Sequence, residues 1–413
     1  MERFDFIISC KYASVPGEGT LTRLFYLAKF LVEAGYKVKL INSFSNHLSL
    51  ITKSEVESNR LIDGVYVETK KTLSYGNSSS IFRLFSWVHY ELQVLYTMLF
   101  RNRSRIFIVS SPSILSTVTG LIVRKLTRSQ LITDIRDIWP ATLVEEGNKS
   151  LDNPFIKLMA WIEKLGYSKS DMILSSIPKL NKHIKETIGI ARPFHCFPMG
   201  YDDIDLKDLE SQGTEVACPF KTKPNNILVG YAGSLGMTNN MDGFIDVIAE
   251  SNDEQIDFLI VGDGVLLEVY KNKLSSNNNV TFTGRVTKQT ARNYLKACDV
   301  VYLSTHESSL WRYGQSMNKL FDYMLLGKTV LASYPKDGYQ SMINEANCGR
   351  FIASNSKQEL IEALRDFMNM DRKQLNSIGS AGQTWILHNR HYRSLTEDFL
   401  KALEHYNLLN DET

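Results

Sequence analysis

The sequence predicts a mixed α/β protein built from two doubly wound, parallel-sheet domains. Strand-like and helix-like segments alternate along the chain, which is the pattern of a parallel sheet covered by helices. The alternation stops once, over residues 198–226, and then starts again. A length of 413 residues also favours two domains over one.

The first domain is predicted over residues 1–197, where short apolar runs alternate with amphipathic stretches. The stretch LTRLFYLAKFLVEAG, residues 21–35, has helical spacing and ends at a glycine, so we expect a helix that begins near Thr20. The candidate strands are FDFIIS (4–9), YKVKLINS (36–43), RIFIVSS (105–111), SQLITDIRD (129–137), DMILSS (171–176) and FHCFPMG (194–200).

Residues 198–226 are predicted to link the two domains, because they are polar and contain three prolines. The second domain is predicted over residues 227–385, and residues 386–413 are expected to form a helix that packs back on the first domain. The candidate strands of the second domain are ILVGYAG (227–233), DFLIVGDG (257–264), NVTFTG (279–284), DVVYLS (299–304) and TVLAS (329–333).

Two loops of the first domain could do chemistry, because ligands of doubly wound sheets bind beyond the carboxyl ends of the strands. In PGEGTLTR, Gly19 lets the backbone approach a ligand closely, and a simple turn is the alternative interpretation. In DIRDIWP, Arg136 and Asp137 make a charged loop. This loop suits either the wall of an acceptor site or a structural Arg–Asp pair that caps the next helix.

Three turns of the second domain also follow strands. YAGSLG supplies Gly233, Ser234 and Gly236 just before a helix, a small-residue turn that suits a phosphate. VGDG supplies Gly262 and TGRV supplies Arg285 at the ends of the next two strands. Each turn alone is weak evidence for a ligand site.

The segment RYGQSMNKLFDYMLLGKTVLAS, residues 312–333, predicts a helix that starts with Asn318 and Lys319 and stops at a glycine. A lysine is unfavourable at the positive end of a helix dipole unless an anion lies opposite, which indicates a phosphate. Asp322, one turn later, could accept hydrogen bonds from ribose hydroxyls, and Ser316 lies in the same loop. The alternative is a surface ion pair between Lys319 and Asp322.

Composition excludes several classes. A formal net charge of +2 is too small to indicate nucleic-acid binding. Five scattered cysteines without a CxxC pair, and histidines without zinc-ligand spacing, indicate a reduced, cytoplasmic protein, and the N-terminus shows no signal peptide. Asp203 and Asp205 form a DxD triplet, but it lies in the link and follows no strand, so we predict no metal site.

The most apolar window is SIFRLFSWVHYELQVLYTMLF, residues 80–100, and it is followed by Arg101, Arg103 and Arg105. Polar side chains interrupt it, so it is a poor membrane span. We expect either a buried helix with a solvated basic end or a helix that lies on an anionic membrane surface.

Taken in order, these pieces resemble family 4 of the retaining GT-B glycosyltransferases over essentially the whole chain. The variants DIRDIWP and NKLFDYM are similar to those of the branch that builds O-antigen and capsule polysaccharides. The resemblance implies two Rossmann-like domains facing across a cleft, with the acceptor on residues 1–197 and the sugar donor on residues 227–385. The matching pieces are PGEGTLTR, SSPS from Ser110, DIRDIWP, PMGYD, YAGSLG, VGDG, FTGRVTKQTARNYLKACDV and SMNKLFDYMLLGKTVLAS.

The resemblance implies transfer of a sugar, with retention of configuration, from a nucleotide diphosphate such as UDP to a polyprenyl-diphosphate-linked glycan. It places the protein in the cytoplasm, peripherally at the inner face of the cell membrane, and implies no cofactor and no metal. Such chemistry needs stabilisation of the developing diphosphate charge. That need implies a catalytic role for Lys319, and the resemblance also implies catalytic roles for Arg136 and Asp137 in the charged loop. The implied donor-binding residues are Gly19, Gly233, Ser234, Gly236, Gly262, Arg285, Ser316, Asn318 and Asp322.

The chain departs from the family in two places. Many members carry a glutamate at each end of an E-x7-E motif, where Gly314 and Asp322 stand here. Many also carry an arginine and a lysine after the first strand of the donor domain, where Ser234 and Asn240 stand, so another cation must replace them. The alternatives are a non-catalytic GT-B protein that binds a nucleotide sugar or glycan, and a sugar-nucleotide epimerase, for which only His306 is available to move a proton.

Overall fold

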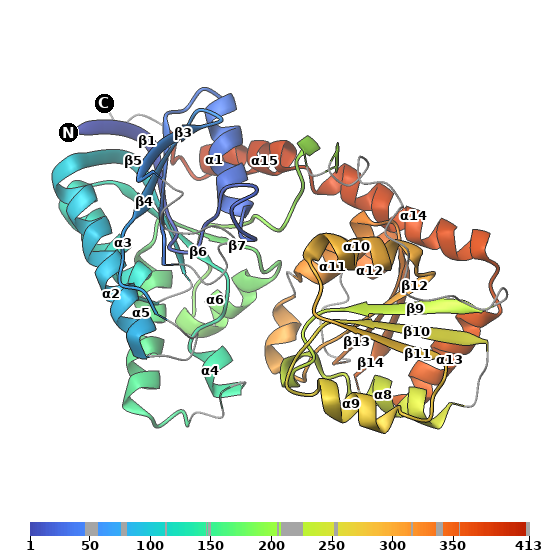
Figure 1. The fold of residues 1–413 in the computed structure, drawn as a ribbon. Helices are drawn as coiled ribbons and strands as arrows, with labels where there is room; N and C mark the ends of the chain where they lie inside the picture. Colours follow the sequence, from blue (N-terminus) through green and yellow to red (C-terminus); the bar gives the residue numbers. More distant parts are fainter. Residues whose placement is uncertain are drawn as a thin grey trace. The chain divides into compact units, whose positions relative to one another are not determined.

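The computed structural model describes residues 1–45, 57–75, 81–111, 114–145, 147, 150–204, 206–207, 226–251, 255–314, 317–335, 342–354 and 356–409. The chain divides into two compact units, one formed by Met1–Asp202 with Tyr392–Thr413 and the other by Asp203–His391 (Figure 1). The chain therefore passes between the units at 202/203 and 391/392, whereas the sequence pattern suggested boundaries at 197/198, 226/227 and 385/386.

The first unit is built on an eight-stranded sheet with the order β3-β4-β2-β1-β5-β6-β7-β8. All neighbouring strands run parallel except β3 and β4, which pair antiparallel. The strands are β1 (Glu2–Ser9), β2 (Val38–Ser43), β3 (Asn59–Ile62), β4 (Val65–Lys70), β5 (Asn102–Ser111), β6 (Gln130–Ile135), β7 (Met172–Ser175) and β8 (Phe194–Cys196).

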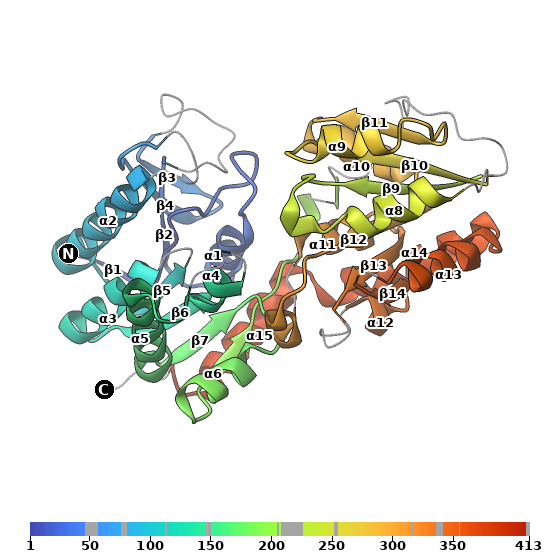
Figure 2. The ribbon, with the colours of Figure 1, turned by 90° about the horizontal axis from the view of Figure 1, so that it is seen from below.

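Helices cover both faces of this sheet (Figure 2). Alternate residues of β1 point to opposite faces, so Phe6 and Ile8 pack with α1 and α15, while Ile7 between them packs with α2 and α3. The helical elements are α1 (Arg23–Glu33), α2 (Ile81–Tyr96), the π-helical turn η2 (Thr97–Arg101), α3 (Ile114–Thr127), α4 (Ala141–Glu145), α5 (Pro154–Lys169), α6 (Leu180–Ile188) and α15 (Tyr392–His405).

Several expectations for the first unit need correction. Helix α1 begins at Arg23 rather than near Thr20. The hairpin β3–β4 was not predicted, although Asp63 and Gly64 at its turn both have positive φ and form the Asp-Gly pair typical of such turns. The basic run that follows the apolar window does not form a solvated end of the helix. Strand β5 starts at Asn102, and Arg103 lies opposite Arg3 of β1 in the register of the sheet.

The second unit has a six-stranded, fully parallel sheet with the order β11-β10-β9-β12-β13-β14. This order reverses between β9 and β12, so a crevice is expected at the carboxyl ends of these strands. The strands are β9 (Ile227–Ala232), β10 (Ile256–Val261), β11 (Val280–Gly284), β12 (Val300–Ser304), β13 (Thr329–Tyr334) and β14 (Gly349–Ala353).

Helices of the second unit flank this sheet, and a large apolar core fills the space between one face of the sheet and the helices that cover it. Helix α11 starts at Asn318, as the sequence predicts, and its N-cap Met317 makes no side-chain capping hydrogen bond. The helical elements are η3 (Met237–Asn239), α8 (Asp242–Glu250), α9 (Leu267–Lys273), α10 (Lys288–Ala297), η4 (Ser309–Tyr313), α11 (Asn318–Leu325), α12 (Met342–Ala346), α13 (Lys357–Met368) and α14 (Arg372–Asn389).

Candidate functional site

A pocket of about 390 Å³ lies at the carboxyl ends of β9, β10 and β11 in the second unit. That volume is within the range of small-molecule sites. Its position is the one expected for ligands of a doubly wound sheet. The lining residues are Ala232, Gly233, Ser234, Val261, Gly262, Asp263, Gly264, Arg285, Val286 and Ala291. Four predicted donor-site residues, Gly233, Ser234, Gly262 and Arg285, are therefore brought together here.

Glycine is required where the turns after β9 and β10 touch. Gly262 has φ +146°, and a Cβ built there would overlap the carbonyl oxygen of Gly233. The N–H of Gly233 donates to the Val261 carbonyl, and the N–H of Gly262 donates to the Gly284 carbonyl. Both N–H groups are therefore used within these turns, and neither is free to bind an anion in the pocket.

Lys319 brings a cation to the pocket wall. Its Nζ donates to the hydroxyl of Tyr231 (3.0 Å) and to Oδ1 of Asn239 (2.7 Å), and it lies 4.8 Å from the centre of the Tyr231 ring. A Cβ added at Gly233 would collide with this ammonium group, so Lys319 lies directly against a residue that lines the pocket. The helix α11 thus supplies the charge that Ser234 and Asn240 do not.

The ammonium group of Lys319 has no carboxylate partner among the residues that the structure describes; its hydrogen bonds go to neutral oxygens. Burial lowers its pKa to about 8 from the ordinary 10.5. A buried cation without a counter-ion is costly, and a bound anion would relieve that cost. The Tyr231 hydroxyl that it meets stays protonated, because burial raises the pKa of this phenol, and it donates to the Ser234 carbonyl (2.8 Å).

Sequence reasoning missed Tyr231 and Asn239, which hold Lys319 in place. Asn239 also donates from Nδ2 to the Ser234 carbonyl (2.8 Å), so one side chain joins the lysine to the turn after β9. These residues lie 88 and 80 positions away from Lys319 in the chain. No local sequence signal could have paired them.

Asp322 does not pair with Lys319, so the surface-pair interpretation is wrong. Its Oδ1 accepts from Arg292 (3.0 Å) and its Oδ2 lies 3.5 Å from Nζ of Lys288. Both cations belong to α10. A carboxylate has about four acceptor positions, so ribose hydroxyls could still reach Asp322 beside these partners.

The remaining predicted donor-site residues fall in different places. Arg285 is exposed, lines the pocket and makes no hydrogen bond or ion pair within the described chain. Asn318 is the first residue of α11 and is exposed. Gly236 is the N-cap of η3 and is not part of the pocket lining. Ser316 lies outside the described residues.

The other predicted residues belong to the first unit. Gly19 is half-buried in the loop between β1 and α1. Arg136 is half-buried after β6, and the exposed Asp137 borders a small cavity of about 20 Å³ that Trp139 also lines. That volume is no more than one water molecule needs, so the cavity cannot hold a sugar.

The segment DIRDIWP begins with a buried aspartate at the end of β6, whose structural role the sequence did not reveal. Asp134, which is fully buried, accepts two hydrogen bonds from Arg23 of α1 (2.8 and 2.6 Å) and one from the Ser110 hydroxyl (2.6 Å). Arg23 also donates to the Phe197 carbonyl (2.7 Å). This pair is not the one expected within the loop to cap the next helix: its arginine comes from α1, and the pair ties this helix to two strand ends.

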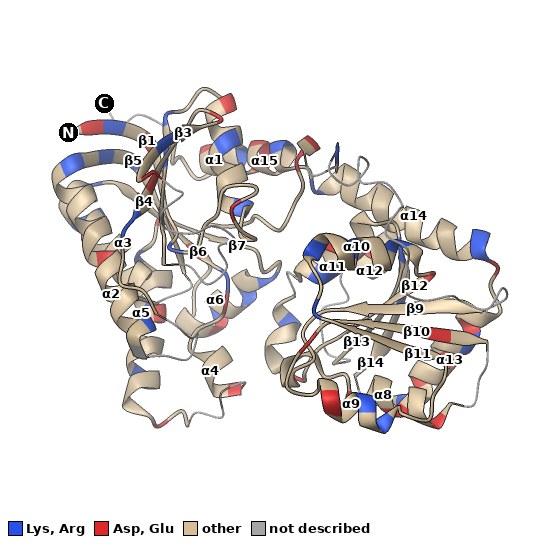
Figure 3. Cartoon of the chain, in the orientation of Figure 1, with Lys and Arg blue, Asp and Glu red and all other residues tan. Residues whose placement is uncertain are grey.

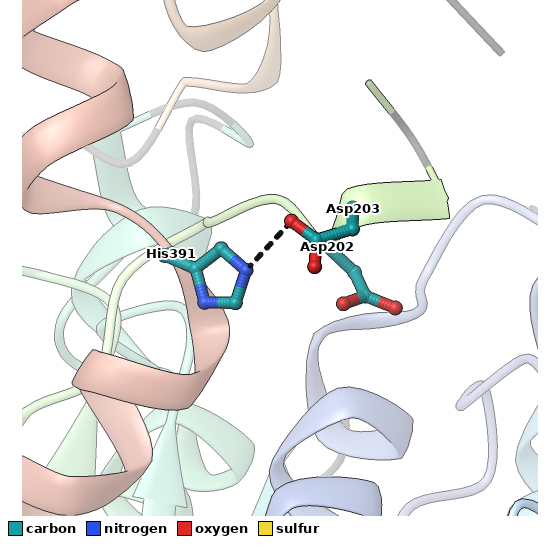
Figure 4. A group of neighbouring side chains, drawn as sticks. All are labelled: Asp202, Asp203 and His391. Atoms are coloured by element: carbon teal, nitrogen blue, oxygen red, sulfur yellow. Dashed lines mark hydrogen bonds and ion pairs between the residues drawn. The ribbon is translucent and has the colours of Figure 1, made fainter. Parts of the chain in front are cut away.

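Two acidic residues of the link have side-chain partners. Asp203 lies 3.3 Å from Nε2 of His391, and Figure 4 draws this pair together with Asp202. Asp202 is itself bound by Lys29 (2.6 Å). Asp205, the other half of the DxD triplet, lies outside the described residues. Asp202, Asp203 and His391 bring one ligand atom each within 4.8 Å of one another.

Comparison with known proteins agrees with this architecture. Residues 226–370 match the family model described as glycosyl transferases group 1. No curated protein sequence matches the chain significantly.

Solved structures extend the similarity to nearly the whole chain. Sucrose-phosphate synthase from Thermosynechococcus elongatus superposes with a TM-score of 0.72 at 12% identity, covering 99% of this chain and 100% of that one. HepE from Anabaena, in complex with UDP-glucose, gives 0.63 at 15% identity, with 97% and 100% covered. WaaG, a glycosyltransferase involved in lipopolysaccharide biosynthesis, gives 0.61 at 15% identity, with 96% and 99% covered. The chain therefore has the GT-B fold, as predicted, and the match to the glycosyl transferases group 1 model falls within its second unit.

Proposed function

We propose that this protein is a glycosyltransferase whose second unit binds a nucleotide-diphosphate sugar, most simply a UDP-sugar. The observation that carries the proposal is the Lys319 ammonium group, buried without a carboxylate partner against the pocket at Gly233. An exposed arginine, Arg285, lines the same pocket. Two cations around a glycine-lined pocket suit a diphosphate better than a neutral ligand.

In this proposal Lys319 stabilises the charge that grows on the diphosphate as the sugar leaves. Such stabilisation needs a fixed cation in a partly dehydrated site, because the interaction is stronger there than in water. Tyr231 and Asn239 hold the ammonium group in place through neutral hydrogen bonds, which leave its charge uncompensated for the ligand. In the same proposal Asp322, which is held by Arg292, accepts hydrogen bonds from the ribose hydroxyls.

The finer features of the proposal come from the family resemblance. They are retention of the anomeric configuration, a hexosyl or N-acetylaminosugar donor, a polyprenyl-diphosphate-linked acceptor, and a role in O-antigen or capsule assembly at the inner face of the cell membrane. We propose that Arg136 and Asp137 belong to the acceptor side, and that no divalent metal is needed. The diphosphate oxygen of the leaving group takes the acceptor proton, which requires no pair of carboxylates.

A donor screen tests the proposal. Purified protein is titrated calorimetrically with UDP, UMP and uridine, and is then incubated with a panel of nucleotide sugars and a short soluble diphosphate-linked acceptor. We expect UDP to bind more tightly than UMP, and UMP more tightly than uridine, because each phosphate meets a cation. Proton NMR of the product then reports whether the anomeric configuration is retained.

Two outcomes would contradict the proposal. Equal affinity for UDP and uridine would mean that the pocket does not recognise a diphosphate. Tight UDP binding without turnover of any sugar nucleotide would instead favour the non-catalytic GT-B protein.

A further inference from the structure

Four helical elements, α2, η2, α3 and α5, form one continuous layer on the first unit, which we call the helix layer (Figures 1 and 2). Helices α2 and α3 share one apolar core with the face of the sheet opposite to α1 and α15. Helix α5 packs against α3 where Gly166 meets Thr117. The outer surface of the layer is therefore formed by three neighbouring helices.

The outer surface of the helix layer is unusually apolar. It carries 12 of the 23 large hydrophobic side chains that are exposed in the described parts of the chain. On α2 they recur at helical spacing, and on α5 three of them lie three residues apart, so each helix presents an apolar stripe to solvent. The 12 residues are Phe82, Leu84, Phe85, Val88, Leu92, Tyr96, Phe100, Ile122, Leu126, Phe155, Leu158 and Trp161.

The charge on the layer has a single sign. Figure 3 marks the acidic and basic positions along the chain. The only two carboxylates of the layer, Glu91 and Glu163, are buried, so these four elements expose no acidic side chain. Helix α15, on the opposite face of the same sheet, exposes Glu397, Asp398 and Glu404. The basic residues of the layer are Arg83, Arg101, Arg124, Lys125, Lys157, Lys164 and Lys169.

Some of these cations have acidic partners from neighbouring segments. Asp171 pairs with Arg124, and Asp152 pairs with Lys157. Lys125, Lys164 and Lys169 are exposed and make no hydrogen bond or ion pair within the described chain. The layer thus keeps unpaired cations among apolar side chains.

We propose that the helix layer is a single docking surface for an anionic lipid bilayer, with α5 as a second apolar anchor beside α2. Exposed apolar and aromatic side chains, together with basic groups and no exposed carboxylate, are what an interfacial membrane surface requires. None of the described helices is long and apolar enough to cross a bilayer. The inference deepens the proposed function, because it names the surface that would bring the enzyme to a lipid-linked acceptor.

A second copy of the chain is a poorer occupant. A symmetric dimer through the layer would place the same basic surface on both sides of the interface, because a two-fold contact uses one patch twice. Neither copy would offer exposed carboxylates from these elements to neutralise the other. An anionic bilayer supplies the missing negative charge.

The charge test uses flotation with vesicles that contain 30% phosphatidylserine, or phosphatidylcholine alone, at low salt. Lys125→Glu/Lys164→Glu changes the charge of the layer without breaking any ion pair that the structure records. Each basic residue near an anionic surface contributes about 1 kcal/mol, or roughly fivefold in binding, so the double reversal should lower partitioning at least ~100-fold. Arg365→Glu/Lys373→Glu on the second unit makes the same net-charge change on exposed residues and should lower partitioning far less.

The apolar test separates α5 from α2. Leu92→Ser and Trp161→Ser each remove a side chain that is 60% exposed, so neither should unfold the protein. Each should lower partitioning onto the anionic vesicles by about tenfold, because each removes apolar area that would enter the interface. Leu387→Ser/Val269→Ser removes exposed apolar side chains from the second unit and should leave partitioning unchanged.

These results separate the surface from the enzymatic function. If the parent does not float with anionic vesicles, or if the layer variants float as well as the parent, the inference is wrong, whatever the activity. If the layer variants differ from the parent in oligomeric mass but not in flotation, the layer binds a second copy of the chain, and the inference is also wrong. The same variants should bind UDP with the affinity of the parent. If the parent itself does not bind UDP, the proposed function is contradicted, but the flotation result still stands.

Discussion

Replacing Lys319 with methionine keeps the length of the side chain and removes its charge. Two unit charges about 4 Å apart interact by roughly 4 kcal/mol at an effective dielectric constant of about 20. Removing one donor that stabilises a developing anion costs about 100- to 1000-fold in turnover. We therefore expect Lys319→Met to lower kcat/KM for the sugar nucleotide by at least ~100-fold while the protein still folds.

The proton balance of UDP binding gives a sharper readout of the same side chain. In the empty pocket burial lowers the pKa of Lys319 to about 8, so at pH 8 about half of these groups are neutral. A bound diphosphate favours the charged ammonium and should raise this pKa. UDP binding at pH 8 should then take up as much as about half a proton, which calorimetry in Tris and in HEPES detects from their different ionisation enthalpies.

The same pKa shift predicts how stability depends on pH. The folded-state pKa of about 8 lies below the ordinary 10.5, so between these values the unfolded chain binds more protons. The contribution of Lys319 to stability therefore rises with pH across this window, and Lys319→Met should remove that rise. Chemical denaturation between pH 7.5 and 10.5 measures it.

Matched controls decide this case. Lys373→Met removes an exposed lysine from α14 and should leave turnover, proton uptake and the pH dependence of stability near those of the parent. If Lys319→Met retains full turnover, or if its UDP binding takes up as many protons as the parent, the phosphate role of Lys319 is refuted.

Four further outcomes are expected. Asp322→Ala should raise the KM for the donor more than it lowers turnover. The ligand 2′,3′-dideoxy-UDP lacks the ribose hydroxyls and should therefore bind the parent and the variant with equal affinity. An unchanged KM would leave Asp322 a purely structural ion-pair residue. Gly262→Ala should abolish UDP binding in calorimetry, because its Cβ has no room, whereas Gly236→Ala, whose Cβ would lie 3.5 Å from its nearest neighbour, should bind normally. Asp134→Asn should lower the free energy of unfolding by about 3–5 kcal/mol in urea denaturation, because it leaves Arg23 buried without its counter-ion; a loss below about 1 kcal/mol would contradict this. Turnover in excess EDTA should equal that in magnesium, and a loss that magnesium restores would reveal a metal requirement.

Much of the fold could be predicted because it is encoded locally. Continuous apolar runs such as those of β9 and β10 are what strands buried on both faces require. Gly327, with φ +67°, ends the helix that contains Lys319, as its position in the sequence indicates. The β3–β4 hairpin was missed although its Asp-Gly turn was legible, because the expected βαβ alternation left no place for an antiparallel strand.

The candidate site could be predicted only in part. Sequence alone identified the glycine-rich strand ends and Lys319, since backbone freedom and a misplaced charge are local properties. It did not identify the partners of Asp322, because the choice between Lys319 and Arg292 depends on how α10 packs beside α11. For the same reason the sequence suggested a solvated basic end at Arg103. In the structure the Arg103 side chain donates to the Met98 carbonyl within the π-helical turn (2.5 Å).

The sequence by itself therefore determined the two-sheet architecture, the strand-end position of the pocket and the lysine in the first turn of α11. Tertiary structure alone decided which groups bind the ammonium group of Lys319, because Tyr231 and Asn239 come from a distant part of the chain. It also decided which face of the apolar window is covered. Periodicity fixes which residues share a face of a helix, but only packing against the sheet determines which face remains exposed to its surroundings.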